Sequence, residues 1–153
     1  MVNRITEKYF LPNTFAERSP TILQEVIQAS GFSPAEELFS GRLYDKDKVW
    51  SVVHRGTWKG KPAVLKIQGL PLEMEEYEIH ERFAKQNTSE KIRLPEIFVK
   101  RPWNETKGYS FCILESIQGE RIYSMPFANE AQMDDFLEFY REYKAHCVSQ
   151  PWF

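Results

Sequence analysis

The sequence has few of the residues that build disulfide scaffolds and metal sites. It contains two cysteines, Cys112 and Cys147, and three scattered histidines. Two distant cysteines form neither a disulfide framework nor a C-x-x-C site, and the histidines show no zinc-ligand spacing. The sequence therefore predicts no metal site. It indicates a reduced, cytoplasmic protein in which both cysteines are small buried residues.

Long apolar runs and an excess of one charge are also absent. No apolar run approaches the roughly 20 residues of a membrane span, and the first residues lack the apolar core of a secretion signal. The 153 residues include 20 Lys and Arg against 22 Asp and Glu, a formal net charge of −2. Because a nucleic-acid surface usually needs a basic excess, we expect neither a nucleic-acid partner nor a membrane partner.

Apolar residues make up 42% of the chain and recur with the periods of helices and strands. A helix is expected to begin at Pro20, after Ser19 as its N-cap, and to end at Gly31. Pro34 is expected to start a turn. Further helices are expected over residues 72–86 and 129–147. The expected strands are 38–44, 49–58, 62–68, 94–101 and 109–116.

Short turns join the expected strands within each group, which makes them antiparallel. The turns are DKDK between the first two strands, WKGK between the next two, and WNETKG between the last two. The fold class is therefore expected to be α+β, with a five-stranded antiparallel sheet and the helix 72–86 on one of its faces.

The strand PAVLKIQ contains a lysine within its apolar run. Lys66 lies between Leu65 and Ile67, and a buried ammonium group is costly unless it is paired or meets a charged ligand. Because side chains alternate along a strand, Val64 and Lys66 share the face opposite to that of Leu65. If the register follows the WKGK turn, Val53 of the preceding strand joins them. The result is an apolar surface with one cation at its end.

The following helix offers several glutamates as partners for Lys66. Glu76 lies three residues before Ile79 and seven before Phe83, so it is expected on the helix face that packs on the sheet. Glu75 is displaced from it by about 100°. A Lys66–Glu76 pair would hold the ammonium group and leave N–H donors for an anionic ligand. The alternative is a lysine that reaches water, beside a solvated glutamate.

Several segments, in the right order, resemble the small lobe of the protein-kinase-like fold. VVHRGTWKGKPAVLKI resembles its second and third strands, and EYEIHERFA resembles its αC helix. LPEIFVKR and YSFCILESIQGERI resemble the fourth and fifth strands and the hinge. The PEI entry and the ILESIQGE exit are most similar to the aminoglycoside phosphotransferase and small-molecule kinase branch. The resemblance extends over roughly residues 37–147, which makes it more specific than a single motif.

This resemblance implies an ATP site. Lys66 would bind the α- and β-phosphates and pair with Glu76. Val53 and Val64 would cover the adenine ring, and Leu114 would be the gatekeeper residue. The adenine edge would meet backbone groups of the hinge, namely the carbonyl of Glu115 and the N–H and carbonyl of Ile117.

Two parts of the family's chemistry are missing from the sequence. The stretch in place of the glycine-rich phosphate loop, DKDKVWS, has no glycine, although Lys46 and Lys48 could supply charge. Phosphoryl transfer also needs one aspartate to orient the acceptor hydroxyl and another to hold Mg²⁺. The four aspartates lie in the first hairpin turn and on the last helix, and no H-x-D or D-F-G motif is present.

Two functions are therefore open. The first is the nucleotide-binding small lobe of an ATP-dependent phosphotransferase, inactive as this chain alone, with Mg²⁺ supplied through a missing C-terminal lobe or a partner chain. Residues 1–36 would be an arm and helix, 37–120 the small lobe, and 121–153 a helical segment leading to the missing lobe. The second is a non-catalytic, pseudokinase-like interaction module that self-associates, because the last helix carries an apolar stripe. The stripe is Met133, Phe136, Leu137, Tyr140 and Cys147.

Overall fold

A computed structural model of the chain describes residues 14–42, 49–90, 92–118 and 130–149. The chain divides into two compact units. The first unit extends to Tyr77 and includes Pro95–Ile117, and the second contains Glu78–Leu94 and the residues from Gln118 onward.

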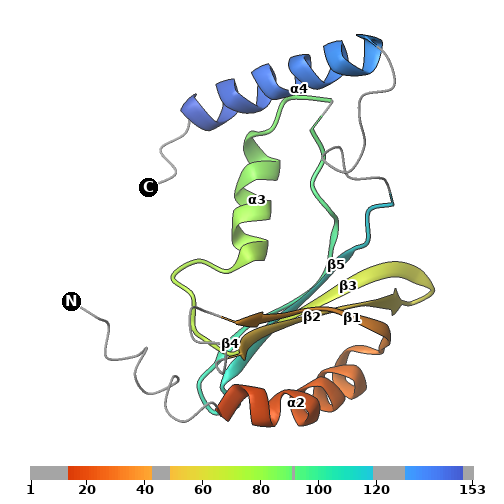
Figure 1. Ribbon diagram of the computed structural model, residues 1–153. Coiled ribbons are helices and arrows are strands. Elements are labelled where there is room, and N and C mark those ends of the chain that lie inside the picture. Colours follow the sequence, from red (N-terminus) through yellow and green to blue (C-terminus); the bar gives the residue numbers. More distant parts are fainter. Residues whose placement is uncertain (1–13, 43–48, 91, 119–129, 150–153) are drawn as a thin grey trace. The chain divides into compact units, whose positions relative to one another are not determined.

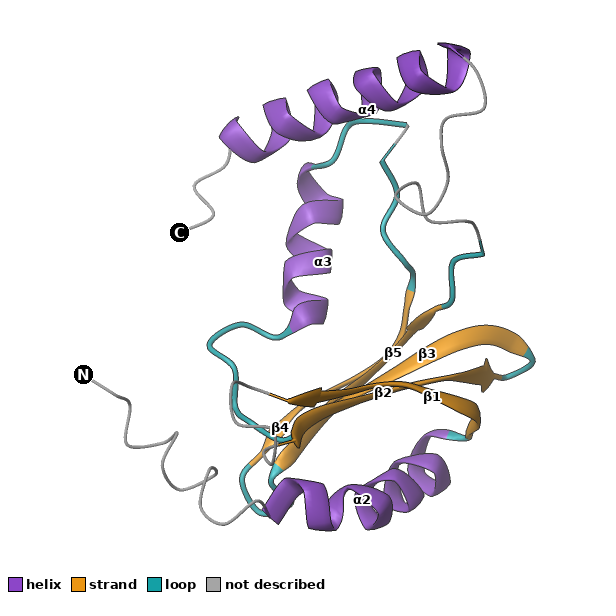
Figure 2. Cartoon of the chain, viewed as in Figure 1, coloured by secondary structure: helices purple, strands orange, loops and turns teal. Residues whose placement is uncertain are grey.

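The first unit contains a five-stranded sheet in the order β1-β2-β3-β5-β4 (Figures 1 and 2). All neighbouring strands are antiparallel. The predicted α+β class and the predicted sheet are confirmed, and the second strand has its predicted bounds. The strands are β1 (Phe32–Arg42), β2 (Val49–Trp58), β3 (Lys61–Gln68), β4 (Ile97–Asn104) and β5 (Tyr109–Glu115).

Helix α2 (Thr14–Ser30) covers one face of this sheet (Figure 1). It begins before the predicted start, so Pro20 lies inside it. Proline has no N–H to donate to the carbonyl of Ala16. The Ser19 hydroxyl donates a hydrogen bond to that oxygen instead, at a distance of 3.0 Å. The predicted end is correct, because Gly31 adopts a φ of 72° directly after the helix.

The main core lies between α2 and the sheet. Leu65 and Ile67 of β3 and Ile113 of β5 are fully buried in one cluster with Val26 of α2. Buried and half-buried residues alternate along β3, and Lys66 is among the half-buried ones. The predicted alternation is therefore confirmed, and α2 covers the face that does not carry Lys66.

Two predicted strand starts are wrong, and both involve proline. β1 begins at Phe32 and contains Pro34, which was expected to start a turn, while β4 begins at Ile97 and contains Pro102. Both are edge strands, where proline is tolerated because its missing N–H leaves no ladder bond unmade. The DKDK turn lies outside the described residues.

Helix α3 (Glu76–Gln86) begins later than predicted, and helix α4 (Glu130–Ser149) is close to its prediction. Ile79 is 41% exposed, whereas Phe83 and Tyr77 are buried, so the expectation that Ile79 shares a buried face with Phe83 is wrong. Glu75 precedes the helix and is buried. The expected rotation of about 100° between Glu75 and Glu76 around a helix axis therefore does not apply. No described helix is both long and apolar enough to cross a membrane.

The second unit joins the loop after α3 to α4. The Asn87 side chain donates hydrogen bonds to the carbonyl oxygens of Ser89 and Ile92, over 3.3 and 2.7 Å. The Ser89 hydroxyl donates to the carboxylate of Glu142 on α4. The loop is therefore held both by its own asparagine and by α4.

The buried imidazole of His54 predicts a pH-dependent stability. His54 lies opposite Leu65 on the α2 face of β2 and is 8% exposed. Burial lowers the pKa of His54 below its ordinary 6.5, and Glu37 offsets this only in part. The unfolded chain therefore takes up a proton near pH 6.5 that the folded chain does not. We expect the free energy of unfolding to fall as the pH drops below about 6.5, by up to about 1.4 kcal/mol per pH unit.

Urea denaturation at pH 7.5 and at pH 5.5 checks this expectation. Other groups also titrate in this range, so His54→Leu is measured beside the wild type. The loss of stability on acidification should be smaller in His54→Leu than in the wild type. An equal loss in both proteins would mean that His54 does not set the pH dependence.

Candidate functional site

Lys66 and Glu76 are in contact, as the sequence predicts. The Lys66 ammonium group donates a hydrogen bond to the Glu76 carboxylate and forms an ion pair with it. The two side chains are 29% and 33% exposed, so a ligand can reach the pair. Glu76 is the first residue of α3, where the helix N-terminus stabilises a carboxylate. An ammonium group has further N–H donors, which leaves capacity for an anion beside the pair.

The strand register places the other predicted side chains around Lys66. Val53, Lys66 and Cys112 form one directly paired row across β2, β3 and β5, and Val64 and Leu114 are paired two rows further on, the next row on the same face. Directly paired residues of antiparallel strands point to the same face. We call the surface of Val53, Val64 and Leu114 beside Lys66 the shelf. Val53 and Val64 are half-buried, and Leu114 is buried.

The two predicted hinge residues lie at and after the end of β5. The backbone N–H of Glu115 donates to the carbonyl of Glu96 at a distance of 2.8 Å, so this N–H is not offered to a ligand. Among the described residues, the backbone of Ile117 makes no hydrogen bond, and its side chain is 49% exposed. The contacts of Glu115 and Ile117 with an adenine ring stay a prediction.

Sequence reasoning missed two aromatic residues beside the shelf. Phe39 of β1 is directly paired with Val53 and is 55% exposed, so it extends the shelf toward the sheet edge. Tyr77 is buried and packs with Cys112 and Leu114. Alternation along the first strand could have indicated Phe39. Helical spacing could not indicate Tyr77, because its burial depends on neighbours from the sheet.

Cys112 is buried beside the Lys66–Glu76 pair. Burial raises the pKa of its thiol to about 12, helped by the negative charges of Glu76 and Glu75 and opposed by the positive charge of Lys66. Because the thiolate is the reactive form, we expect Cys112 to react at least about 100-fold more slowly with a thiol reagent in the folded protein than in the unfolded chain.

The measurement uses a Cys147→Ser variant, in which Cys112 is the single cysteine. The rate of reaction with a chromogenic disulfide is followed at pH 7.5, first in buffer and then in concentrated urea. Similar rates in the two conditions would show that Cys112 is neither buried nor protonated as described.

The position of the predicted phosphate stretch relative to this site stays a prediction. Residues 43–48, including Lys46 and Lys48, lie outside the described residues. Asp134 and Asp135 are exposed on α4, which belongs to the second unit. Within the described part of the chain, no group of three or more His, Cys, Asp or Glu side chains could hold a metal ion.

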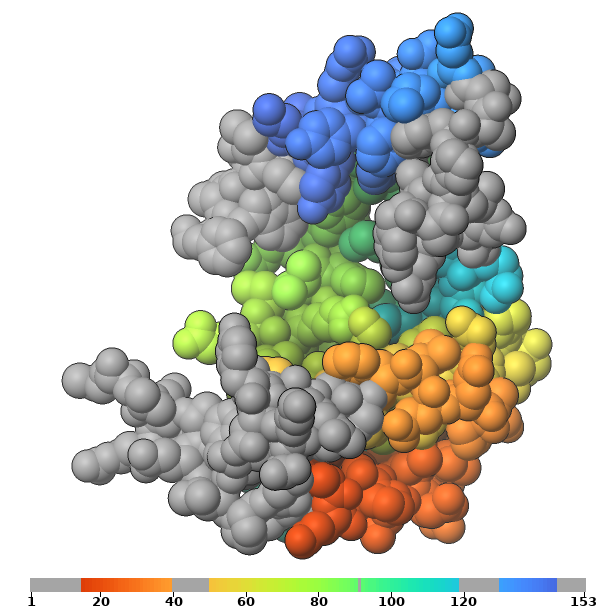
Figure 3. Space-filling view, in the orientation of Figure 1, coloured from red at the N-terminus to blue at the C-terminus, as the bar shows by residue number. Residues whose placement is uncertain are grey.

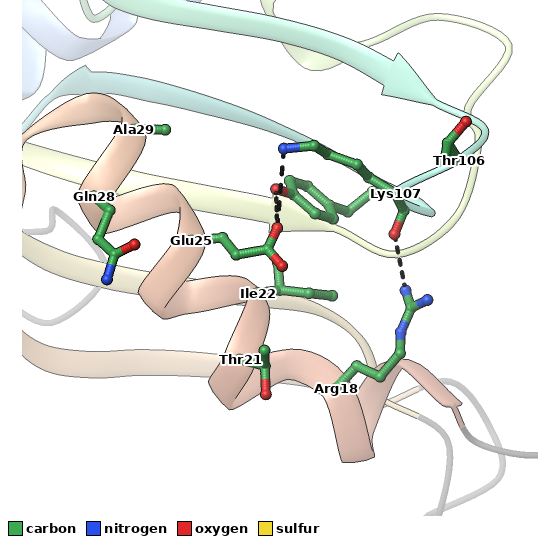
Figure 4. A pocket seen from close by; sticks show the side chains of 9 residues that line it. Arg18, Thr21, Ile22, Glu25, Gln28, Ala29, Thr106 and Lys107 are labelled. Carbon is green, nitrogen blue, oxygen red and sulfur yellow. Dashed lines mark hydrogen bonds and ion pairs between the residues drawn. The ribbon is translucent and has the colours of Figure 1, made fainter.

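An open groove of about 700 Å³ lies elsewhere in the first unit, between α2 and the β4–β5 turn (Figure 4). Arg18 donates hydrogen bonds to the carbonyl oxygens of Lys107 and Gly108, each with a donor–acceptor distance of 3.3 Å. The Glu25 carboxylate accepts a hydrogen bond from the Tyr109 hydroxyl at a distance of 3.0 Å. One of its oxygens lies 3.9 Å from the Lys107 ammonium nitrogen. These contacts fasten α2 to the turn, and Lys66 does not line the groove.

Known structures share this fold. Neither a protein-family model nor a curated protein sequence matches the chain. The crystal structure of aminoglycoside phosphotransferase APH(4)-Ia is similar at 15% identity and a TM-score of 0.52, over 71% of this chain and 33% of that one. A thermostable mutant of that enzyme is similar at 18% identity and a TM-score of 0.51, over 69% and 32%.

That mutant was solved as a ternary complex with ADP and hygromycin B, and another thermostable mutant with AMP-PNP and hygromycin B. The chain spans about a third of the length of these proteins. At this level of identity the likeness concerns the fold. The described chain has a kinase-like α+β fold, consistent with a small lobe, and the structures that it resembles are aminoglycoside phosphotransferases.

Proposed function

We propose that this chain is the nucleotide-binding small lobe of an ATP-dependent phosphotransferase and that ATP binds on the shelf. The observation that carries the proposal is the Lys66–Glu76 pair at the edge of an apolar, partly exposed surface. Two of the structural neighbours were crystallised with ADP or AMP-PNP, which supports a nucleotide as the ligand.

Each group of the site has a distinct task in this proposal. The side chains of Val53, Val64 and Leu114 would contact the adenine ring and exclude water from it. The Lys66 ammonium group would donate to the α- and β-phosphates, and Glu76 would keep it in place. The carbonyl of Glu115 and the backbone of Ile117 would bind the adenine edge.

Transfer of the phosphoryl group needs residues that this set lacks. When bound, Mg²⁺ would neutralise charge on the phosphates, and its protein ligands would come from a C-terminal lobe or a partner chain. The described residues of this chain bind and orient the nucleotide. We therefore expect no phosphoryl transfer by this chain alone.

Calorimetric titration with ATP tests the proposal. We expect a dissociation constant of about 1 mM or tighter. Val53→Glu should weaken binding at least about tenfold, because a carboxylate on the shelf lies close to the phosphates. Thr57→Glu places the same charge on the same face of β2, at the exposed end of the strand, and should change the affinity little. No ATP binding by the wild type, or equal losses in both variants, would overturn the proposal.

A second function, a self-associating interaction module, is favoured by α4. Three members of its predicted stripe, Met133, Leu137 and Tyr140, are 39–51% exposed, and Phe136 is half-buried. Phe136 stacks on Tyr140 with ring centroids 6.4 Å apart. In Figure 3, α4 is the blue part of the surface. The side chain of Cys147 lies outside the described set. A cluster of exposed apolar side chains on one element can mark an interaction site.

Sedimentation velocity separates the two functions. A self-associating module should sediment as a dimer or larger species at tens of micromolar, and Leu137→Glu should return it to a monomer. A wild-type monomer at this concentration would argue against self-association through α4. It would leave the nucleotide proposal untouched.

A further inference from the structure

The start of α3 is fastened to the sheet by two residues. Glu76 and Tyr77 belong to the same compact unit as the sheet, whereas the helix from Glu78 onward belongs to the second unit. Glu76 makes the ion pair with Lys66. Tyr77 is 7% exposed and forms a small buried cluster with Cys112, Leu114 and the half-buried Ile97.

The Tyr77 cluster lies beside the ion pair. Cys112 is directly paired with Lys66 on the neighbouring strand, so the ring packs on the residue next to the ammonium group. The Lys100 ammonium group from β4 lies 5.8 Å from the centre of the same ring. The Tyr77 ring therefore contacts β5 directly and is flanked by β4. Tyr77 also follows Glu76 directly in the chain.

The ion pair alone is a weak fastening. Its side chains are about a third exposed, and exposed ion pairs are screened by water and contribute little to a fixed geometry. A buried aromatic ring is a stronger anchor, because burial of its apolar surface is favourable and its position is fixed by packing.

We propose that Tyr77 is a positioning residue that holds the Glu76 carboxylate against the Lys66 ammonium group. This inference rests on the proposed function for its effect on ATP. The ring itself does not touch the nucleotide in this account. It acts through Glu76 by fixing the first two residues of α3 on the sheet.

A double-mutant cycle in ATP affinity is the first test. Glu76→Gln should weaken ATP binding by about tenfold, as expected for one lost charge-assisted contact. Tyr77→Ala should weaken it by a similar factor, and the double variant should be no weaker than either single variant. Tyr77→Phe keeps the ring and should bind ATP as the wild type does. Additive losses would show that Tyr77 does not act through Glu76 and would overturn the inference.

A second cycle does not depend on ATP. The coupling between Lys66→Met and Glu76→Gln is measured in the free energy of unfolding, in the wild type and in Tyr77→Phe and Tyr77→Leu backgrounds. The coupling should persist in the Tyr77→Phe background and vanish in the Tyr77→Leu background. Leucine is used here because it is a milder change than alanine, in case Tyr77→Ala does not fold. A coupling that survives Tyr77→Leu, or is absent from the wild type, would overturn the inference. A wild type that binds no ATP but shows this pattern would refute the proposed function alone.

A buried tyrosine from the other core serves as the matched control. Tyr109 lies on β5, is 5% exposed, and packs in the main core on the α2 side. Tyr109→Leu should lower stability while the Lys66–Glu76 coupling is retained. Loss of the coupling in this control as well would mean that any damage to the sheet separates the pair, and Tyr77 would then have no special role.

Discussion

Replacement of Lys66 by methionine is expected to weaken ATP binding by about 10- to 150-fold, the equivalent of ~1.5–3 kcal/mol for lost hydrogen bonds to a charged group. Methionine keeps the length and most of the apolar surface of lysine, so the shelf beside Val53 and Val64 should persist. The phosphates would lose the donor that the proposal assigns to them. Stability should change little, by about 1 kcal/mol or less, because the pair with Glu76 is partly exposed.

Lys61→Met is the matched control for Lys66→Met. Lys61 is the first residue of the same strand and is exposed, with its ammonium group 5.3 Å from the centre of the Phe98 ring. Fluorescence titration of a labelled ATP analogue compares the two variants. The control should bind as the wild type does. Equal affinities for wild type and Lys66→Met would contradict the assignment of Lys66.

Leu65→Ala is expected to lower the free energy of unfolding by about 2–5 kcal/mol, because it leaves a cavity in a close-packed core. Leu65 is fully buried in the cluster that includes Val26 of α2. The next residue, Val64, points to the other face and is half-buried. Val64→Ala should therefore lower stability by only about 1 kcal/mol and should weaken ATP binding.

Urea denaturation of the two β3 variants, combined with ATP titration, checks whether the faces of this strand have separate roles. Leu65→Ala should be much less stable than Val64→Ala, and the folded fraction of Leu65→Ala should bind ATP with nearly wild-type affinity. The reverse order of stabilities would mean that the face assignment of β3 is wrong.

The parts that sequence reasoning predicted best are governed by local rules. The bounds of β2 and the turn at Lys59 and Gly60 were predictable because alternation and tight-turn chemistry act over a few residues. Both turn residues have positive φ, 49° and 78°. The facing of Lys66 followed from the alternation along β3. The contact with Glu76 was expected from helix spacing and the family resemblance together, although Ile79, one of the two residues used for the spacing, is exposed.

The parts that were predicted wrongly depend on neighbours that the sequence does not display. Pro20 lies inside α2 because the Ser19 hydroxyl takes over the hydrogen bond to Ala16. Pro34 lies inside β1 because that strand is at the sheet edge. Tyr77 is buried because β5 presents Cys112 and Leu114 to it. Each case is decided by a side-chain bond or a strand order, which propensity alone does not contain.

A methyl-resolved NMR titration with ATP tests the central claim, nucleotide binding on the shelf, most directly. The account predicts that the methyl signals of Val53, Val64 and Leu114 shift with one common dissociation constant. The signals of Val52, Leu65 and Ile113, on the α2 face, should stay in place. Shifts confined to the α2 face, or no shifts up to about 10 mM ATP, would contradict the account.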